Sequence, residues 1–556
     1  MKKWSKLLIW ILVLVLLLSA CSTGDRKEDN GNPAKEASTT ANSSADTAEK
    51  EKSEDGQSES GEETEDGQML PVSAKDTLVV AHEADSIDLD PFGSTTDVTL
   101  KIKSQVYEPL VEMTIDNEIL PALATEWEYI DDNGTLQMKL REGVKFHNGE
   151  IMTAQDVLFS LELASGSGQS MPVANIDFEK SSAPDDLTVI LAQKTVRFDL
   201  VEYLSIPMAV IFSKKGYEDN GGNWATMDIG TGPYVWGEWA PGDHQDLHAF
   251  EDYWEEGYPL IQNITFKVIT EATNRSIEIE TGSCDLSYNP NVVDLPNLKS
   301  NENLYVYEEL AFDNSIFGFN NADETWANSD LHKAFKWALD VDAAWELALN
   351  DTGAPAHTFV PSNVIGFLGE DRGYTTVGYD LDKAREFLEA SGNGDGITCE
   401  FLVHNRPARL DIATFWANSL KQIGIDLQIN ILDSATITQR LKVEGTFDAF
   451  MWGIATYTSK ADYLLRHMDG IDTPPTLAIC RWQNQEYTDL LNKGVAEPDA
   501  AKAMEYTDAA QELLYENYPV IPLYQQQSTY VMVENLKGIR DGTYQVPLLK
   551  KAYFES

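Results

Sequence analysis

The 556-residue sequence contains none of the common catalytic or nucleotide-binding motifs. It has no G-x-S-x-G nucleophile elbow, no H-E-x-x-H zinc motif and neither glycine-rich phosphate loop, G-x-x-x-x-G-K-[ST] or G-x-G-x-x-G. The Gly- and Ser-rich run at 165–168 lacks the elbow spacing and is typical of a loop. Carboxylates are so numerous that close pairs are inevitable, and no glycosidase pair can be assigned from them. The sequence therefore favours a protein that is not an enzyme and needs no cofactor.

Cysteine is scarce, and acidic residues far outnumber basic ones. The four cysteines, Cys21, Cys284, Cys399 and Cys480, form no C-x-x-C pair, so their spacing indicates no zinc site. If Cys21 is modified, the other three leave room for one disulfide and one free thiol, and the sequence does not choose the pair. The chain has 91 Asp and Glu against 41 Lys and Arg, and a formal charge of −50. A chain this acidic repels phosphate backbones, which argues against nucleic acid as a partner.

Long apolar runs are also absent, apart from one near the N-terminus. Residues 7–18 are all apolar and follow a short basic segment. The run is shorter than the roughly 20 residues of a bilayer-spanning helix, but it suits the core of a signal peptide. The Leu-Ser-Ala-Cys that ends at Cys21 resembles the lipobox of bacterial lipoproteins, in which the leader is removed and the cysteine is acylated. We predict a signal peptide over 1–20 and a lipid anchor at Cys21 that holds the protein on the outer face of the cell membrane; an ordinary secretory signal is the alternative.

The segment behind Cys21 is almost free of large apolar side chains. Between residues 22 and 72 it holds 14 acidic and 5 basic residues. Such a segment cannot bury enough apolar surface to offset its ordering entropy. About 50 flexible residues have a root-mean-square reach of roughly 40 Å. We therefore predict a disordered acidic tether over 21–74, with an acidic interaction tail as the alternative.

The rest of the chain alternates strand-like and helix-like segments. The apolar run 77–83 predicts a strand. Thr153 and Asp156 form the pattern of a capping box and predict the start of a helix, and Gly392 has the position of a residue that ends one. A body of this length is too long for one simple core, so two or more lobes are expected. The pattern indicates an α/β protein with several lobes.

Five segments of this body resemble, in order, the bacterial extracellular solute-binding protein family 5. They read LREGVKFHNGEIMTAQDVLFSLE, GTGPYVWGEWAPGDHQDLHAFEDYWEEGYP, FGFNNADETWANSDLHKAFKWALDVDAAW, GYDLDKAREFLEASG and ENYPVIPLYQQQSTYVMVENLKGI. The family contains the oligopeptide-, dipeptide- and nickel-binding components of ABC importers. The resemblance implies a periplasmic-binding-protein-like clamshell of type II, with two lobes and an inserted domain.

The resemblance also implies domain boundaries. Lobe I would comprise 75–118, 230–310 and 523–556, the inserted domain 119–229, and lobe II 311–522. A solute would lie between the lobes, and the closed form would be recognised by the permease subunits of the importer.

Positions that match family contacts suggest ligand-binding residues. Ser94 and Thr95 lie in the polar loop after the first strand, although a plain turn would also use such residues. Phe319 and Asn320 lie in a strand that matches a stretch lining the cleft, where Phe319 has a core position as its alternative.

Arg406 is the candidate that best fits a charged ligand. It matches a place where peptide-binding relatives carry an arginine that faces a ligand carboxylate, and a guanidinium binds carboxylates with two parallel hydrogen bonds. A surface ion pair is the alternative. His404 lies two residues earlier and is a weak candidate for a metal contact, because nickel-chelate binders use histidines near the cleft.

The segment FMWGIATYTSKADYLL departs from the family pattern. In peptide binders an aspartate here holds the ligand's α-ammonium, but the matching places hold Tyr457 or Lys460, and Asp462 can be matched only with a gap. An unpaired ammonium in a buried cleft would cost about 3–5 kcal/mol, which disfavours simple peptides. Trp452 and Tyr457 are predicted to stack on a sugar, an aromatic group or a cation instead.

Together these features predict a lipid-anchored substrate-binding protein of an ABC importer that captures a short peptide or peptide-like solute. A nickel or other metal chelate and an oligosaccharide are alternative ligands. A secreted lipoprotein hydrolase on the same fold and a sensor of a peptide signal are alternative functions, because a fold alone does not settle function.

Overall fold

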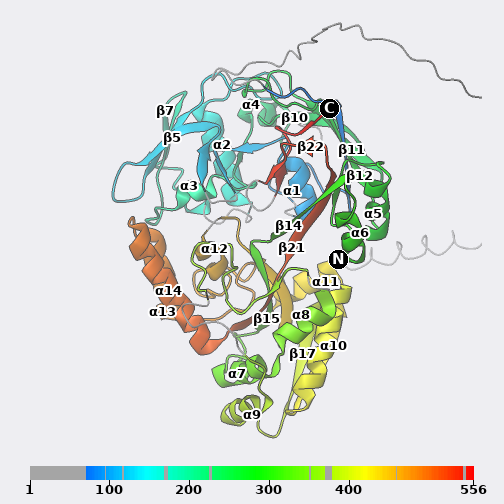
Figure 1. The fold of residues 1–556 in the computed structure, drawn as a ribbon. Coiled ribbons are helices and arrows are strands. Elements are labelled where there is room, and N and C mark those ends of the chain that lie inside the picture. The colour runs from blue at the N-terminus through cyan, green and yellow to red at the C-terminus, as the bar shows by residue number, and fades with distance from the viewer. Residues whose placement is uncertain are drawn as a thin grey trace, which may run out of the picture. The chain divides into compact units, whose positions relative to one another are not determined.

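The structure is a computed structural model that describes residues 70–556, except 94–95, 115–117, 168–172, 224–227, 350–351, 370–377, 459 and 542–545. In these residues no helix is both long and apolar enough to cross a bilayer. Cys21 and the proposed tether up to residue 69 lie outside the described part. The expected α/β architecture is built from three main sheets (Figure 1).

The first main sheet has seven strands contributed by distant parts of the chain. Their order is β10 (Tyr234–Ala240), β11 (His244–Ala249), β12 (Asn263–Val268), β1 (Thr77–His82), β13 (Leu286–Tyr288), β21 (Gln527–Val533) and β14 (Leu304–Leu310). Strand β1 is parallel to both β12 and β13. The nearby helices are α1 (Asp97–Lys103), α5 (Ala272–Glu280) and α6 (Leu295–Lys299). All seven strands fall within the three ranges predicted for lobe I.

A four-stranded antiparallel sheet lies within the range predicted for the inserted domain. Its order is β5 (Ala124–Tyr129), β6 (Leu136–Leu140), β8 (Thr188–Leu191) and β7 (Ser182–Asp185). The other elements in this range are β4 (Ile119–Pro121), α2 (Ala154–Gly166), α3 (Leu200–Tyr203), β9 (Val210–Ile211) and α4 (Lys214–Asp219), and the short strands β2 (Glu108–Pro109) and β3 (Val111–Met113) precede it. One hydrophobic cluster contains both Leu78 of β1 and Met138 of β6. The inserted segment and the seven-stranded sheet therefore share a core.

The third sheet has six strands and two separate cores. Its order is β16 (Ala354–Pro355), β20 (Val520–Gln525), β15 (Asp313–Phe319), β19 (Ala449–Ala455), β17 (Ile397–His404) and β18 (Ile425–Leu432). Neighbours alternate between clusters: Phe317 and Phe401 belong to one, and Ile316 and Leu402 to the other. Since successive strand residues point to opposite faces, each face carries its own core.

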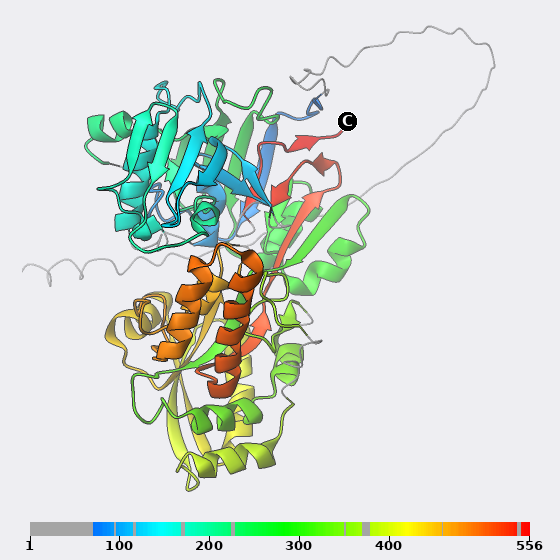
Figure 2. The ribbon, with the colours of Figure 1, turned by 90° about the vertical axis from the view of Figure 1, so that its left-hand side faces the viewer.

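Helices supply the outer layers of this sheet. They are α7 (Ser329–Ala338), α8 (Val341–Leu349), α9 (Leu381–Ala390), α10 (Pro407–Lys421), α11 (Ser434–Thr438), α12 (Ala461–Arg466), α13 (Gln485–Ala496) and α14 (Ala500–Asn517). Figure 2 shows α13 and α14 side by side. The short strands β22 (Leu536–Lys537), β23 (Arg540–Asp541), β24 (Pro547–Leu548) and β25 (Tyr553–Phe554) complete the C-terminal segment.

Two short connections join the seven-stranded and six-stranded sheets. Residues 311–312 lead from β14 to β15, and Gln526 leads from β20 to β21. The connections bond to each other, because Ala311 N–H donates to Gln526 O at 2.8 Å and Gln525 Nε2 donates to Ala311 O at 2.8 Å. These paired crossings are where a change of angle between the two sheets would be absorbed.

The local signals read from the sequence are confirmed. Thr153 N–H donates to Asp156 Oδ2 at 2.9 Å in the capping box that begins α2. Gly392 follows α9 with φ of +85°, the left-handed conformation that glycine adopts without steric cost. The disulfide that the composition left open does not form, since Cys284, Cys399 and Cys480 are all free and buried.

Candidate functional site

Two groups of parallel strands end in charged and polar residues. In the seven-stranded sheet, Glu83 follows β1 and Asn289 follows β13. In the six-stranded sheet, Arg406 and Tyr457 each lie two residues beyond the ends of β17 and β19, which are parallel to each other. In α/β folds, ligands bind outside the carboxyl ends of parallel strands. We therefore call these residues and their neighbours the strand-end site.

One carboxylate oxygen of Glu83 accepts a hydrogen bond, and the other has no partner among the described residues. Its Oε1 accepts a hydrogen bond from Asn289 Nδ2 at 2.9 Å, whereas Oε2 is buried without a partner among the described residues. The nearby Arg275 of α5 does not pair with it, because its guanidinium donates to backbone carbonyls at the ends of β12 and β13, including Tyr288 O at 3.0 Å and Ile269 O at 2.6 Å. An unpaired buried oxygen is costly, so Glu83 has capacity for a cationic donor.

Arg406 is held by His404. Its Nε donates to His404 Nδ1 at 3.0 Å, and the other ring nitrogen lies 2.6 Å from Ser434 Oγ. Burial and the charges of Arg406 and Arg409 lower the pKa of His404 and keep the ring neutral. With both ring nitrogens engaged, His404 orients Arg406 and has no free lone pair for a metal ion.

The side chain of Arg406 is exposed, but it is partly desolvated by its neighbours. Its terminal nitrogens have no hydrogen-bond partner in the described part of the chain, yet loss of solvation lowers its pKa. The charge of Glu83, from the other sheet, acts in the opposite direction and raises the pKa of Arg406. Glu83 and Arg406 therefore lie within electrostatic reach of one another.

Arg409 is a buried charge that makes no hydrogen bond or ion pair within the described residues. It is 8% exposed and lies one turn after Arg406 in α10. Its Nη2 is 3.8 Å from where a Cβ of Gly453 would lie. Asp313, whose pKa burial raises to about 6, is close enough for Arg409 to lower that value, but Asp313 accepts its hydrogen bonds from Gln526 N–H, at 3.2 Å, and the Gln526 side chain.

The two aromatic candidates of β19 lie in different surroundings. Trp452 is half-buried, and Lys442 Nζ lies 5.5 Å from its ring centroid. Tyr457 packs edge-on against Tyr463, with ring centroids 5.5 Å apart, and also against the core shared with the inserted segment. Neither arrangement defines a stacking platform with a free face, so their proposed ligand contacts remain predictions.

Phe319 and Asn320 are placed in packed surroundings. The side chain of Phe319 is fully buried and stacks on His332, with ring centroids 4.3 Å apart. Asn320 uses its amide nitrogen on Gly445 O at 3.2 Å and Phe447 O at 2.9 Å. The structure thus gives Phe319 the environment of its core alternative, and it buries Asn320 with its amide nitrogen bonded to backbone carbonyls. Ser94 and Thr95 lie outside the described residues.

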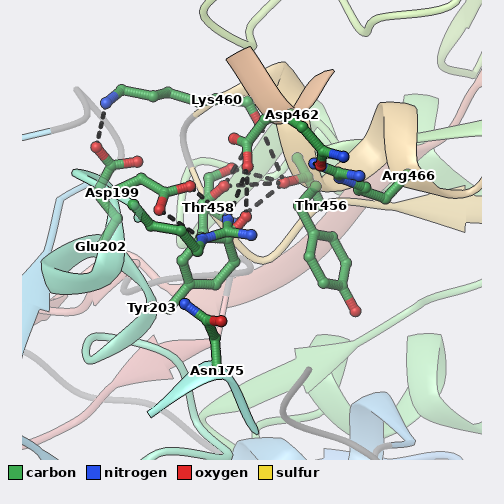
Figure 3. Close-up of polar contacts among 12 residues, drawn as sticks. Asn175, Asp199, Glu202, Tyr203, Thr456, Thr458, Lys460, Asp462 and Arg466 are labelled. Carbon is green, nitrogen blue, oxygen red and sulfur yellow. Dashed lines mark hydrogen bonds and ion pairs between the residues drawn. The ribbon is translucent and has the colours of Figure 1, made fainter. Parts of the chain in front are cut away.

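A second group of charges links the segment 197–203 to the segment 456–466, and we call it the paired cluster (Figure 3). Lys460 pairs with Glu202, and Tyr203 OH donates to Asp462 Oδ2 at 2.7 Å. Arg197 bonds to Asp199 at 2.6 Å and lies 3.7 Å from Asp462. Burial raises the pKa of Glu202 to about 7 and that of Asp462 to about 6. Lys460 and Asp462 are two of the positions that align with the aspartate of peptide-binding relatives. Both are bound to side chains of the inserted segment.

Sequence reasoning missed Glu83, Arg409 and Asp313. A signal existed for the first two, because Glu83 ends an apolar strand and Arg409 lies three residues after Arg406 at the start of a helix. Only the fold shows that Arg409 is buried without a partner in the described residues and that the charge of Glu83 acts on Arg406.

Comparisons with known proteins identify the family. Residues 118–472 match the model of bacterial extracellular solute-binding proteins, family 5. The chain is 25% identical over 475 residues to glutathione-binding protein GsiB of Escherichia coli K12, covering 84% of this chain and 92% of that protein. It is also 25% identical over 450 residues to GsiB of Pectobacterium atrosepticum, covering 80% and 85%.

A solved structure shows the same fold. Periplasmic binding protein DppA from Helicobacter pylori, in complex with the peptide STSA, superposes with a TM-score of 0.77 at 23% identity, over 86% of this chain and 98% of that one. The family and the α/β periplasmic-binding-protein fold expected from the sequence are confirmed, and proteins of this family bind solutes and are not enzymes. The chain belongs to family 5 of the bacterial extracellular solute-binding proteins, and it is a substrate-binding protein of an ABC importer for peptides or related solutes.

Proposed function

We propose that this protein is anchored by a lipid on Cys21 to the outer face of the cell membrane, captures a short peptide or peptide-like solute between its two lobes, and delivers it to the permease subunits of its importer. The tether 21–74 would hold the binding body off the membrane. The single observation that carries the choice of solute is the strand-end site, where Glu83, with one buried oxygen unpartnered in the described residues, follows a strand of one sheet and Arg406 follows a strand of the other.

Peptides suit this arrangement because they carry both charges. A free peptide has an ammonium group for Glu83 and a carboxylate for Arg406, and each charge then finds a partner of opposite sign when water is displaced. The relatives named above support this choice, since glutathione and the peptide STSA are both solutes of this kind. The unpartnered oxygen of Glu83 would also bind the ammonium group, in place of the aspartate that is missing at Tyr457.

Native mass spectrometry of the full-length protein in detergent tests the proposal. We would compare the protein as purified with the protein after addition of peptides, glutathione, nickel–histidine and oligosaccharides. A bound peptide, released intact on unfolding, is the expected result, and it should raise the melting temperature, because ligand at about 100 times its Kd adds roughly 2.7 kcal/mol. Binding of only a metal chelate or a sugar would overturn the peptide assignment.

The anchor is tested separately. A Cys21→Ser variant should lose the acyl mass, while its peptide binding stays unchanged. Retention of Cys21→Ser on the membrane with an unprocessed leader would be expected of a blocked lipoprotein precursor, so the decisive reading is the mass of the N-terminal peptide of the wild type. An unmodified cysteine there would overturn the anchor.

A further inference from the structure

We propose that the paired cluster is a proton-controlled latch between the inserted segment and the lobe of the six-stranded sheet. The latch takes up one proton when the lobes close on a solute and releases that proton when they open. This inference concerns residues outside the strand-end site, and it rests on the proposed capture of a solute between the lobes. It predicts that solute affinity rises as the pH falls through neutrality.

The first line of evidence is the place of the cluster between two bodies of the fold. The inserted segment shares one core with the seven-stranded sheet, whereas the segment 456–466 follows β19 of the six-stranded sheet and includes α12. The ion pair of Lys460 with Glu202 therefore ties the two bodies together without a covalent link. Phe198 N–H adds a hydrogen bond to Val495 O at 2.9 Å. A change of angle at the chain crossings acts on all these contacts.

The segment 456–460 connects the cluster to one of those crossings. Thr456 N–H donates to Phe312 O, in the crossing from β14 to β15, at 2.9 Å. Thr456 Oγ1 lies 3.0 Å from Thr458 O and 3.3 Å from Lys460 O, and Thr458 N–H donates back to Thr456 Oγ1 at 3.2 Å. These bonds stiffen the short path between the crossing and Lys460. A displacement at the crossing is therefore transmitted to the cluster.

The second line of evidence is an excess of negative charge in the cluster (Figure 3). Two cations meet three carboxylates, and the five residues are Arg197, Lys460, Asp199, Glu202 and Asp462. Glu202 Oε2 and Asp462 Oδ1 are buried and have no hydrogen-bond partner in the described part of the chain. Buried acceptors are nearly always satisfied in folded proteins. One added proton would remove the excess charge and would turn one of these oxygens into a donor.

Glu202 is the group that holds this proton. Burial raises its pKa to about 7, against the opposing charge of Lys460. Burial also raises the pKa of Asp462, to about 6, where the charge of Arg197 and the hydrogen bond from Tyr203 limit the rise. Opening the lobes removes both the burial of Glu202 and its contact with Lys460. Because burial is the larger influence, the pKa of Glu202 then falls toward its ordinary value of 4.5.

The remaining titratable and charged groups around Glu202 do not compete for the proton. On the surrounding elements these are Tyr129, Tyr203, Tyr463, His467, Glu112 and Arg466. Burial raises the pKa of each tyrosine above 10 and lowers that of His467 to about 4, so these groups are neutral near pH 7. Glu112 pairs with Lys550 at 2.8 Å, and Arg466 pairs with Asp469 at 2.9 Å.

The sign of the effect follows from the higher pKa of Glu202 in the closed form. At about pH 6 the closed form holds a proton that the open form has released, and at about pH 8 neither form holds it. Closure therefore takes up close to one proton at about pH 6. Solute affinity should be about 10-fold higher at about pH 6 than at about pH 8.

Titration calorimetry of the full-length protein in detergent, with glutathione and trialanine as probes, tests this linkage. Measurements in phosphate and in imidazole buffer, which differ in ionisation enthalpy, count the protons taken up on binding. Glu202→Gln mimics the protonated form, so it should bind like the wild type at about pH 6 and about 10-fold more tightly at about pH 8. The ratio of the two affinities cancels the titration of the solute itself. A ratio that stays constant over this range would overturn the latch.

Two further variants sharpen the assignment. Lys460→Met removes the cation that lowers the pKa of Glu202, so the midpoint of the affinity profile should move above pH 7. A midpoint that does not move would overturn the pairing of Lys460 with Glu202 in the closed form. The matched control is Glu278→Gln, which breaks a Lys–Glu pair with Lys267, at 2.8 Å, within the lobe of the seven-stranded sheet. This control should keep the pH profile of the wild type.

A measurement without solute separates the latch from the choice of solute. Spin labels on Glu142→Cys, beside the inserted sheet, and on Lys493→Cys of α13 report the distance between the two bodies, since both positions are exposed and the cysteines of the described residues are buried. The population with the shorter distance should grow between about pH 8 and about pH 6, and Glu202→Gln should keep it at both. Unchanged distances would overturn the latch even if peptides bind. A pH-dependent distance in a protein that binds no peptide would support the latch and overturn only the peptide assignment.

Discussion

The strand-end site and the paired cluster contain similar residue types but use them in opposite ways. In the paired cluster Arg197, Lys460 and Tyr203 all bond to carboxylates of the same cluster. In the strand-end site Arg409 makes no hydrogen bond or ion pair in the described chain. Carboxylate oxygens without a partner occur in both groups, at Glu83 Oε2 in the site and at Glu202 Oε2 and Asp462 Oδ1 in the cluster. An unpaired buried charge lowers the stability of the folded state, unless another interaction compensates for its lost hydration. The comparison separates cations that are bonded to carboxylates of the fold from Arg409, which is not.

The largest effect is expected from breaking the paired cluster. Arg197→Ala leaves the carboxylates of Asp199 and Asp462 buried beside each other without their cation. The free energy of unfolding should fall by about 3–5 kcal/mol, measured by urea denaturation. Arg385→Ala, at an exposed position on α9, is the control and should stay within about 0.5 kcal/mol of the wild type. A loss as small as that of the control would show that the cluster does not stabilise the fold.

The next effect is a pH dependence carried by Glu202. Burial raises its pKa to about 7, against the opposing pull of Lys460 and with the help of Asp199 and Asp462. The folded state therefore binds a proton at a pH where the unfolded state has released it, so stability rises as pH falls through about 7. Relative to Glu202→Gln, the wild type should gain about 1 kcal/mol between about pH 8 and about pH 6. Parallel stability curves for the two proteins would contradict the assignment.

The cluster and the site also differ in how far the sequence could predict them. Local signals were sufficient for the capping box of Thr153 and for Gly392, because each depends on residues a few positions apart. Family resemblance was sufficient for the fold and for Arg406 as a candidate. The hydrogen bond of Tyr203 to Asp462 and the electrostatic influence of Glu83 on Arg406 join residues far apart in the chain, so no local pattern encodes them. Phe319 shows the converse, since an apolar residue in a cleft-matching strand proved to lie in the core.

A smaller effect on solute affinity is expected when the hydrogen bond that fixes Arg406 is removed and Arg406 itself is kept. His404 accepts a hydrogen bond from Arg406 Nε at 3.0 Å and thereby fixes the guanidinium. His404→Ala should weaken the binding of free peptides by about 3- to 10-fold, the equivalent of one lost neutral hydrogen bond. Calorimetry with C-amidated peptides is the control, because Arg406 would have no carboxylate to bind there. An equal loss for both peptide forms would indicate a general distortion of the site.

The smallest effect on stability is expected from Arg406 itself. Its side chain is exposed, and His404 is its one hydrogen-bond partner in the described residues. Arg406→Ala should therefore change the free energy of unfolding by no more than about 0.5 kcal/mol in the absence of solute, while it weakens peptide binding strongly. Urea denaturation without ligand and calorimetry with it give the two readings on one preparation. A large loss of stability would place Arg406 with the charges of the paired cluster, as part of the fold and not of the strand-end site.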